Sequence, residues 1–236
     1  MIQVKNLYKI YTVGETKVYA LNGVDFTIYK GEFCAIVGPS GSGKSTLLNM
    51  LAGLEKPTRG EIVIAKTHIE KMTENQLVAF RRQQVGFIFQ SYNLLQTMNA
   101  VENVALPLSF RGVSKKERNE TAKKFLTLVG LAKQMKHKAN EMSGGQQQRV
   151  GIARALAVSP KIIFADEPTG NLDSKTTMEV LELMRKVVRE NHQTLIMVTH
   201  DNHIASFADR QFHIVDGKIL KIEERQHDAG EDYEAL

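Results

Sequence analysis

Long apolar runs without polar interruption dominate the hydrophobic pattern of this chain. Residues 33–37, 85–89, 161–167 and 194–199 each centre on four or five consecutive residues that are apolar or glycine. Such runs predict strands buried on both faces, as in a parallel sheet covered by helices. The pattern therefore predicts an α/β fold whose core is a mainly parallel sheet flanked by helices.

The first 30 residues follow a different pattern, with shorter apolar segments separated by turn signals. Strands are predicted at residues 2–4, 18–21 and 24–28, and turns at Gly14, at Asn22-Gly23 and at Lys30-Gly31. A further strand is predicted at residues 61–64 and a closing hairpin at residues 211–222. The short early segments indicate an N-terminal antiparallel β subdomain.

Helix signals fill much of the remaining chain. Thr73 and Gln76 have the spacing of a capping box before a helix that ends near Arg82, and Ser114 and Glu117 repeat that spacing. Further helices are predicted over residues 147–158 and 174–191. Residues 91–141 are mostly helical in character, which predicts a helical subdomain inserted into the α/β core.

Composition agrees with one globular domain, expected at residues 1–222, followed by a polar tail at residues 223–236. Of the 236 residues, 42% are hydrophobic and 24% are charged, so the chain can bury a core. No apolar run approaches the roughly 18 residues of a membrane span, and the N-terminus lacks the apolar core of a signal peptide. Cys34 is the single cysteine, which suits a reducing cytosol.

Positive charge is concentrated in the segment 111–138. Nine basic residues lie there against two acids, within a net charge of +5. Two interpretations remain open, a solvated helical face or a surface that meets anionic lipid headgroups. Few aromatic residues interleave with these charges, so no nucleic-acid partner is expected.

The first apolar run leads into a phosphate-binding pattern. The sequence Gly-x-x-x-x-Gly-Lys-Ser begins directly after residue 37. Its glycines let backbone N–H groups surround an anion, Lys44 supplies a positive charge for the outer phosphates, and Ser45 can ligate Mg²⁺. The expected contact residues are Gly38, Pro39, Ser40, Gly41, Ser42, Gly43, Lys44, Ser45 and Thr46.

Polar side chains stand where the other core strands end. Gln90 follows one strand, Asp166 and Glu167 end another, and His200 ends a third. Ligands of α/β folds gather at the carboxyl ends of parallel strands. Asp166 is expected to hold Mg²⁺, Glu167 to polarise the attacking water, and His200 to bond the terminal phosphate. Gln90 is expected either to reach the metal or a nearby water, or to cap its loop.

Two more stretches offer ligand contacts. Ser143, Gly144, Gly145 and Gln146 open a helix, which makes either a second anion site or a plain helix cap. Tyr11 lies ahead of the phosphate-binding segment, where its ring either stacks on a nucleotide base or packs against its neighbours.

The order of these features resembles the nucleotide-binding domain of ABC transporters over about residues 1–222. Met142 replaces the usual leucine of the signature, a small departure because both are flexible apolar residues. By this resemblance, Tyr11 matches the base-stacking aromatic, residues 38–46 match the Walker A segment, and Gln90 matches the Q-loop. Residues 142–146 match the signature, and residues 163–167 match Walker B. Residues 171–173 match the D-loop with Asp173, and His200 matches the switch histidine.

The resemblance implies a P-loop NTPase that hydrolyses ATP to ADP and phosphate and is coupled to transport. Lys44, Glu167 and His200 are then the catalytic residues, and Ser45, Gln90 and Asp166 the Mg²⁺ ligands. Ser143 and its neighbours cover the nucleotide of a second subunit, so a head-to-tail homodimer is implied. Integral membrane permease subunits are also implied, with an extracytoplasmic adaptor protein acting through them. The ATPase then lies on the cytoplasmic face of the cell membrane.

Residues 11–21 and 165–173 are similar to the ATPases of lipoprotein-releasing systems and of macrolide or antimicrobial-peptide exporters. The short loop at residues 14–17 is one feature that favours this branch over FtsE-like cell-division ATPases, which share the Gly-Asn-Leu-Asp segment and remain the alternative within the family. A soluble ABC ATPase that acts on nucleic acid is a second alternative, but the chain has no heptad repeat for a long coiled coil. A nucleotide kinase or switch GTPase leaves Ser143 and His200 without a role.

Overall fold

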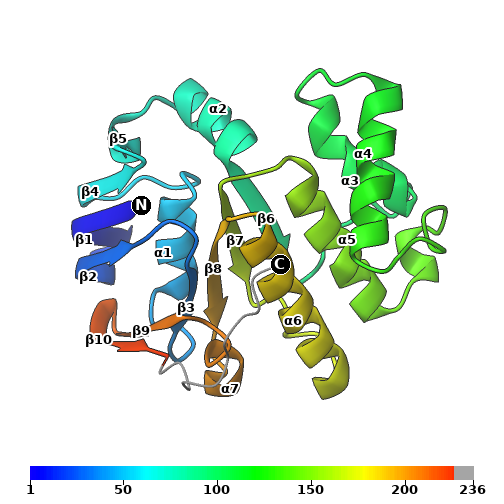
Figure 1. Ribbon diagram of the computed structural model, residues 1–236. Helices are drawn as coiled ribbons and strands as arrows, with labels where there is room; N and C mark the ends of the chain where they lie inside the picture. Colours follow the sequence, from blue (N-terminus) through cyan, green and yellow to red (C-terminus); the bar gives the residue numbers. More distant parts are fainter. Residues whose placement is uncertain (226–236) are drawn as a thin grey trace.

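A computed structural model describes residues 1–225 and contains two sheets with helices around them (Figure 1). The larger sheet has six strands in the order β10-β9-β3-β8-β7-β6. The strands β3, β6, β7, β8 and β9 run parallel to one another, and only β10 at the edge is antiparallel, to β9. Their bounds are β3 Phe33–Val37, β6 Val85–Phe89, β7 Ile162–Asp166, β8 Thr194–Thr199, β9 Arg210–Val215 and β10 Lys218–Glu224. The predicted parallel core is confirmed.

The smaller sheet is antiparallel, with the order β2-β1-β4-β5. It contains β1 Ile2–Val13, β2 Thr16–Ile28, β4 Arg59–Ile64 and β5 Thr67–His68. The predicted turn at Asn22-Gly23 is wrong, because β2 continues through it. Gly23 has a φ of 75°, and the register with β1 shifts nearby. This irregularity lets Tyr8 pass close to Gly23, where a Cβ would lie 2.9 Å from the Tyr8 hydroxyl.

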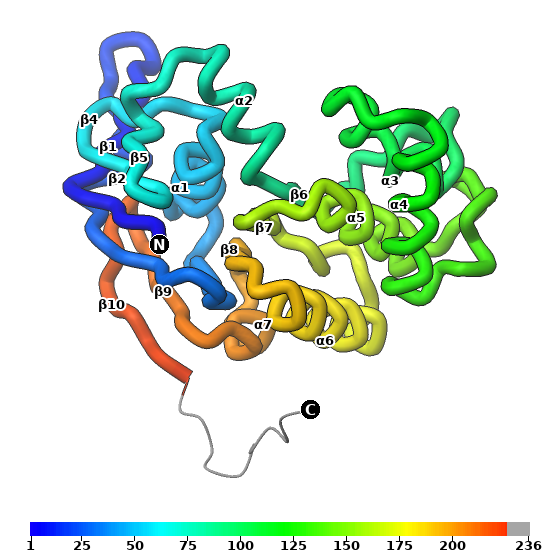
Figure 2. Tube along the Cα trace, turned by 45° about the horizontal axis from the view of Figure 1, so that its top comes forward, coloured from blue at the N-terminus to red at the C-terminus, as the bar shows by residue number. Residues whose placement is uncertain are grey.

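Helices cover the larger sheet and form a separate layer beside it. The α-helices are α1 Lys44–Leu51, α2 Glu74–Gln84, α3 Ala100–Ser109, α4 Lys115–Leu128, α5 Gly144–Ala157, α6 Ser174–Glu190 and α7 Asn202–Ala205. Figure 2 shows α3 and α4 on the side of α5 away from the smaller sheet, as the predicted helical insertion requires. The strand β10 ends two residues beyond position 222, and most of the tail expected at 223–236 lies outside the described residues.

The two predicted capping boxes behave differently. Thr73 and Gln76 exchange both expected bonds at the start of α2. At the start of α4, the Ser114 hydroxyl accepts from the Glu117 N–H, but Glu117 turns its carboxylate to that hydroxyl at 2.7 Å. The helix begins where the spacing predicts in both cases, since one cap bond is enough to fix its first turn.

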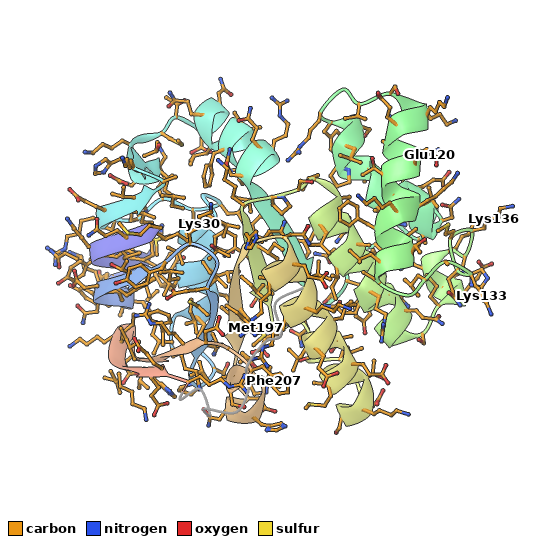
Figure 3. All side chains as sticks on the ribbon, in the orientation of Figure 1. Lys30, Glu120, Lys133, Lys136, Met197 and Phe207 are labelled. Carbon is orange, nitrogen blue, oxygen red and sulfur yellow. The ribbon has the colours of Figure 1, made fainter. Side chains whose placement is uncertain are left out.

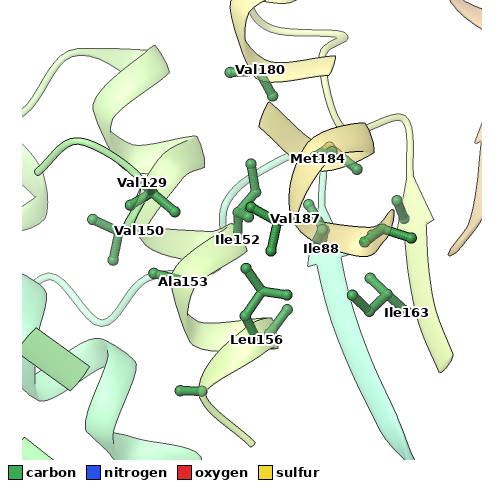
Figure 4. Packing of buried hydrophobic residues seen from close by; sticks show 14 of the residues in the cluster. Ile88, Val129, Val150, Ile152, Ala153, Leu156, Ile163, Val180, Met184 and Val187 are labelled. Atoms are coloured by element: carbon green, nitrogen blue, oxygen red, sulfur yellow. The ribbon is translucent and has the colours of Figure 1, made fainter. Parts of the chain in front are cut away.

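Side chains of the parallel strands alternate between two hydrophobic cores. Ile163 and Ala165 belong to the core under α5 and α6, whereas Ile162 and Phe164 belong to the core shared with α1 and the smaller sheet. Figure 4 shows Ile163 packed near side chains of α5 and α6. This burial on both faces explains why the strands lack polar alternation.

The basic segment forms an exposed part of the helical layer. Lys133 and Lys136 lie at its outer edge with Glu120 on α4 above them (Figure 3). Each of these three side chains is exposed, as either interpretation of the segment requires.

Over residues 1–225, no helix is long and apolar enough to cross a membrane.

Candidate functional site

The parallel strands bring the predicted site residues to one edge of the sheet. Val37 pairs with Thr199, and Asp166 pairs with both Val198 and Phe89. The residues that follow these strands therefore start from neighbouring positions. The P-loop, Gln90, Asp166, Glu167 and His200 are gathered along this carboxyl edge, as the sequence predicts.

The P-loop (residues 38–45) is curled around the side chain of Lys44. Its Nζ donates to the carbonyl oxygens of Gly38 at 2.9 Å and Pro39 at 2.8 Å, and the residue is buried. Gly41 and Gly43 have φ values of 78° and 99°, in the left-handed region. A Cβ on Gly41 would meet open space, whereas one on Gly43 would lie 2.3 Å from the Ala20 oxygen.

This geometry fits a phosphate cradle made of backbone. Glycine is required where the loop passes close to Ala20, and the open side at Gly41 leaves room for a ligand. The Ser42 hydroxyl is buried and has no hydrogen-bond partner within residues 1–225. The helix α1 starts directly behind the loop and directs its positive dipole end toward the cradle.

The hairpin turn between β9 and β10 supports the P-loop from behind. The Gly217 N–H donates to the Ser42 oxygen at 3.1 Å, and the Gly217 oxygen accepts from the Asn22 N–H at 2.8 Å. A Cβ on Gly38 would lie 2.1 Å from the Ile214 oxygen of β9. The hairpin predicted at residues 211–222 contains this turn at Asp216-Gly217, but nothing in the local sequence indicates that the turn contacts the P-loop.

Tyr11 lies near the start of α1. Its hydroxyl donates to the Glu55 carboxylate at 2.8 Å, and the Lys9 ammonium lies 5.1 Å from its ring centroid. Burial and the Glu55 carboxylate raise the pKa of Tyr11, and a bond with Thr46 opposes them. The residue is 36% exposed, so part of the ring remains accessible beside the P-loop helix. Stacking on a base remains a prediction.

Ser45 and Asp166 form the candidate metal site. The Ser45 hydroxyl donates to an Asp166 carboxylate oxygen at 3.4 Å. Burial raises the pKa of Asp166, and so does the adjacent Glu167 carboxylate, while Ser45 and Lys44 lower it. Two neighbouring carboxylates in a partly buried position favour a bound cation.

The donor set fits Mg²⁺. Hydroxyl and carboxylate oxygens are hard ligands, and Mg²⁺ commonly takes one or two protein oxygens together with phosphate and water. Within the described chain, no three His, Cys, Asp or Glu side chains gather closely enough to hold a metal. A metal at Ser45 and Asp166 therefore needs further ligands from a nucleotide and from water.

Glu167 and His200 form a hydrogen-bonded pair. Nδ1 of His200 lies 2.8 Å from a carboxylate oxygen of Glu167. Glu167 has a φ of 46°, and its N–H donates to the Val198 oxygen at 3.0 Å. A glutamate in this conformation stores roughly 1–3 kcal/mol of strain, which is a common feature of functional positions. The sequence assigned these two residues separate partners and did not reveal that they contact each other.

Gln90 lies against the loop that follows β7. Its main-chain oxygen accepts a bond of 3.0 Å from the Asn171 side chain. A Cβ on Gly170 would lie 2.7 Å from Nε2 of Gln90, so this glycine makes room for the amide. Gln90 is thereby held close to the segment that carries Glu167; its bond to a metal or a water remains a prediction.

The Ser143 turn (residues 143–146) lies at the start of α5, against Tyr92 and Thr176. Ser143 and Gln146 form both bonds of a capping box at the start of α5. A Cβ on Gly144 would lie 2.8 Å from the Tyr92 hydroxyl, and one on Gly145 would lie 2.4 Å from Cγ2 of Thr176. The first N–H groups of a helix lack partners within it, so this end of α5 can receive an anion.

Asp173 has a structural role that the sequence did not assign to it. Its carboxylate accepts a bond of 3.0 Å from the Thr176 N–H and so caps α6. The backbone bond from Thr176 lowers the pKa of Asp173. The starts of α5 and α6 are thus neighbours, since Thr176 also contacts Gly145. Binding of a nucleotide by Asp173 remains a prediction.

Comparison with known proteins gives one family. The family model described as "ABC transporter" matches residues 21–170. The lipoprotein-releasing system ATP-binding protein LolD of Geobacter metallireducens is 44% identical over 220 residues, which cover 93% of this chain and 98% of LolD. The macrolide export ATP-binding/permease protein MacB of Wolinella succinogenes is 42% identical over 224 residues, covering 95% of this chain but 35% of MacB.

A solved structure has the same fold. A dimeric post-hydrolysis state of the ATP-binding cassette MJ0796, bound to ADP and Pi, superposes with a TM-score of 0.88. It is 43% identical in sequence, and the match covers 97% of this chain and 100% of that one.

Proposed function

Because this chain belongs to the ABC transporter family, we propose that it is the ATP-binding and ATP-hydrolysing subunit of an exporter or mechanotransmission complex. The observation that carries this proposal is the arrangement at the carboxyl edge of the sheet. There the P-loop, the Ser45–Asp166 pair and the Glu167–His200 pair follow adjacent strands. Similarity to LolD and MacB supports the branch that acts on lipoproteins, macrolides or antimicrobial peptides rather than the cell-division branch.

The P-loop supplies the binding energy for the triphosphate. Its inward N–H groups and the dipole of α1 receive the phosphates, and Tyr11 offers a ring for the base. Lys44 is pre-positioned by the carbonyl oxygens of Gly38 and Pro39, so its charge is fixed before ATP arrives. Ser45, Asp166 and Gln90 would hold Mg²⁺, which neutralises charge on the β- and γ-phosphates when bound.

Glu167 acts as the base that orients and deprotonates the attacking water. Its bond to His200 fixes one carboxylate oxygen and leaves the other available. His200 is well exposed, with 66% of its side chain accessible, so it can also turn toward the terminal phosphate. The pair therefore places a base and a hydrogen-bonding imidazole on the same side of the nucleotide.

A second copy of the chain completes each site. The Ser143 turn lies against Tyr92 and Thr176, and neither of these residues belongs to the P-loop. In a head-to-tail homodimer, this turn covers the γ-phosphate held by the partner subunit. The dimeric MJ0796 structure supports this arrangement. ATP then joins the two subunits, and hydrolysis separates them.

Transport requires further subunits. Integral membrane permease subunits hold the ATPase dimer at the cytoplasmic face of the membrane, and an extracytoplasmic adaptor protein acts through the permease. The fusion named in MacB, an ATP-binding/permease protein, supports this association. Opening and closing of the dimer then drives the permease.

Phosphate release from ATP by the purified chain tests this function. We expect Mg²⁺-dependent turnover by the wild type, and at least about 100-fold slower turnover by the Glu167→Gln variant with unchanged ATP binding. Higher turnover in membranes that contain a permease encoded beside the gene for this chain would support the transport assignment. A monomer selective for GTP, or normal turnover by Glu167→Gln, would refute the assignment.

A further inference from the structure

Arg154 ties the helix of the Ser143 turn to the segment that follows Gln90. It lies on α5, about three turns beyond Ser143. Its guanidinium donates to two successive main-chain oxygens, through Nη1 to Asn93 at 2.5 Å and through Nη2 to Tyr92 at 2.8 Å. A single side chain thus fixes two consecutive peptide groups next to a predicted ligand-binding residue.

The backbone held by Arg154 is in a conformation that it would not keep by itself. Tyr92 and Asn93 have φ values of 59° and 48°, and neither is glycine. Two successive left-handed residues direct their carbonyl groups away from ordinary partners and are unfavourable for a tyrosine. A donor on another element that hydrogen-bonds both carbonyl groups stabilises this turn relative to other backbone conformations.

Gln148 is a second polar side chain of α5 near this turn, and it does not bind the turn. Gln148 lies on α5 six residues before Arg154 and is completely buried, but within residues 1–225 neither end of its amide has a hydrogen-bond partner. Gly151 places both groups in the same neighbourhood. A Cβ built on Gly151 would lie 4.0 Å from the Gln148 side-chain oxygen and 3.9 Å from the Tyr92 carbonyl oxygen. The nearby amide therefore does not replace the guanidinium.

Gln90 is thus held from two directions. Asn171 binds its carbonyl oxygen from the loop after β7, and Arg154 binds the turn two and three residues later from α5. The first contact belongs to the α/β core, and the second belongs to the helix that carries the Ser143 turn. A movement of α5 relative to the core must either pull on Gln90 or break the Arg154 bonds.

We propose that Arg154 is a positioning residue that sets the place of Gln90 and transmits movement between Gln90 and the Ser143 turn. Its effect on catalysis rests on the proposed ATPase function, but its effect on the turn does not. Arginine suits this task because its planar fork reaches two carbonyl groups at once, which a lysine ammonium on a flexible stem does not.

Arg111 provides a matched control. Its guanidinium also donates to main-chain oxygens, those of Arg82 and Val158, and so joins the helical layer to the ends of α2 and α5. Burial lowers the pKa of Arg111 and of Arg154 alike. Within residues 1–225, the hydrogen bonds of Arg111 go to Arg82 and Val158 and not to Gln90 or its turn, so Arg111→Met measures the general effect of losing an arginine that binds main-chain oxygens.

Amide hydrogen exchange of the nucleotide-free protein is the first test. In Arg154→Met, we expect exchange across residues 90–95 to accelerate about tenfold or more, with a smaller acceleration in Arg154→Lys. Arg111→Met should leave that segment unchanged, and urea unfolding should show all three variants folded. Equal exchange at residues 90–95 in Arg154→Met and wild type would overturn the proposal, as would equal acceleration in Arg111→Met.

Steady-state ATP hydrolysis is the second test. Arg154→Met should lower kcat roughly 10- to 100-fold, keep KM for ATP near the wild-type value and raise the Mg²⁺ concentration needed for half-maximal rate. Arg111→Met should change none of these. Accelerated exchange with wild-type kcat would overturn the catalytic part of the proposal. If the wild type itself fails to hydrolyse ATP, the proposed function fails, whereas the exchange result still decides the role of Arg154.

Discussion

Gly145→Ala tests how closely the Ser143 turn packs against α6. The added Cβ would lie 2.4 Å from Cγ2 of Thr176, well inside van der Waals contact. Overpacking costs about 1–3 kcal/mol, and alanine in place of a helical glycine returns up to about 1 kcal/mol. We expect a net loss of about 1 kcal/mol in the free energy of unfolding, which corresponds to a melting temperature about 2–4 °C lower. ATP turnover should fall too, because the start of α5 must move.

Thr176→Ser removes the methyl group that clashes and provides the matching control. Alone, it should cost less than about 1 kcal/mol, because it deletes one partly buried methyl group. Combined with Gly145→Ala, it should restore both stability and turnover, with a coupling energy of about 1–3 kcal/mol in urea unfolding. A double variant that stays unstable would refute the packing argument. A stable but inactive double variant would show that glycine serves the nucleotide directly.

Three further substitutions test the P-loop, the candidate metal site and the Ser143 turn. Lys44→Ala should weaken ATP binding at least about 100-fold in calorimetry, since it removes both the charge and the bonds that close the P-loop; unchanged affinity would contradict its role. Asp166→Asn should raise the melting temperature of the nucleotide-free protein on the order of 1–2 °C at neutral pH. The pKa of Asp166 is higher in the folded chain, so its charge costs stability above that pKa and the cost disappears as pH falls through it. A lower melting temperature for Asp166→Asn would show that the charge of Asp166 stabilises the folded chain, contrary to this reasoning. Ser143→Arg should abolish hydrolysis but keep ATP affinity of the monomer near the wild-type value, and parallel loss of both would argue against a site shared between subunits.

Features that depend on neighbouring residues were predictable from the sequence. The buried strand at residues 33–37 was predicted at its observed bounds, because its apolar run reflects burial on both faces. The capping box at Thr73 was indicated by its spacing to Gln76, and Ser143 was expected to open a helix, since the groups that form a helix cap lie within one turn. The P-loop pattern fixed the position of Lys44 for the same reason.

Features that depend on pairing between distant segments were not predictable. Asn22-Gly23 has a strong turn signal, but pairing with β1 carries β2 through it and converts the signal into an irregularity. The Glu167–His200 bond joins the ends of two strands and has no local signature. Gly145 was expected to expose N–H groups to an anion, whereas the structure shows that it also makes room for Thr176.

The mass of the Glu167→Gln variant in solution, measured with and without Mg²⁺ and ATP, tests the central claim most directly. Blocking the base should trap ATP between the P-loop of one chain and the Ser143 turn of another. Light scattering should therefore report two chains with ATP and one without it, and adding Ser143→Arg should return the trapped species to one chain. A variant that stays monomeric at saturating ATP, while the wild-type monomer hydrolyses ATP at full rate, would contradict a site shared between two subunits.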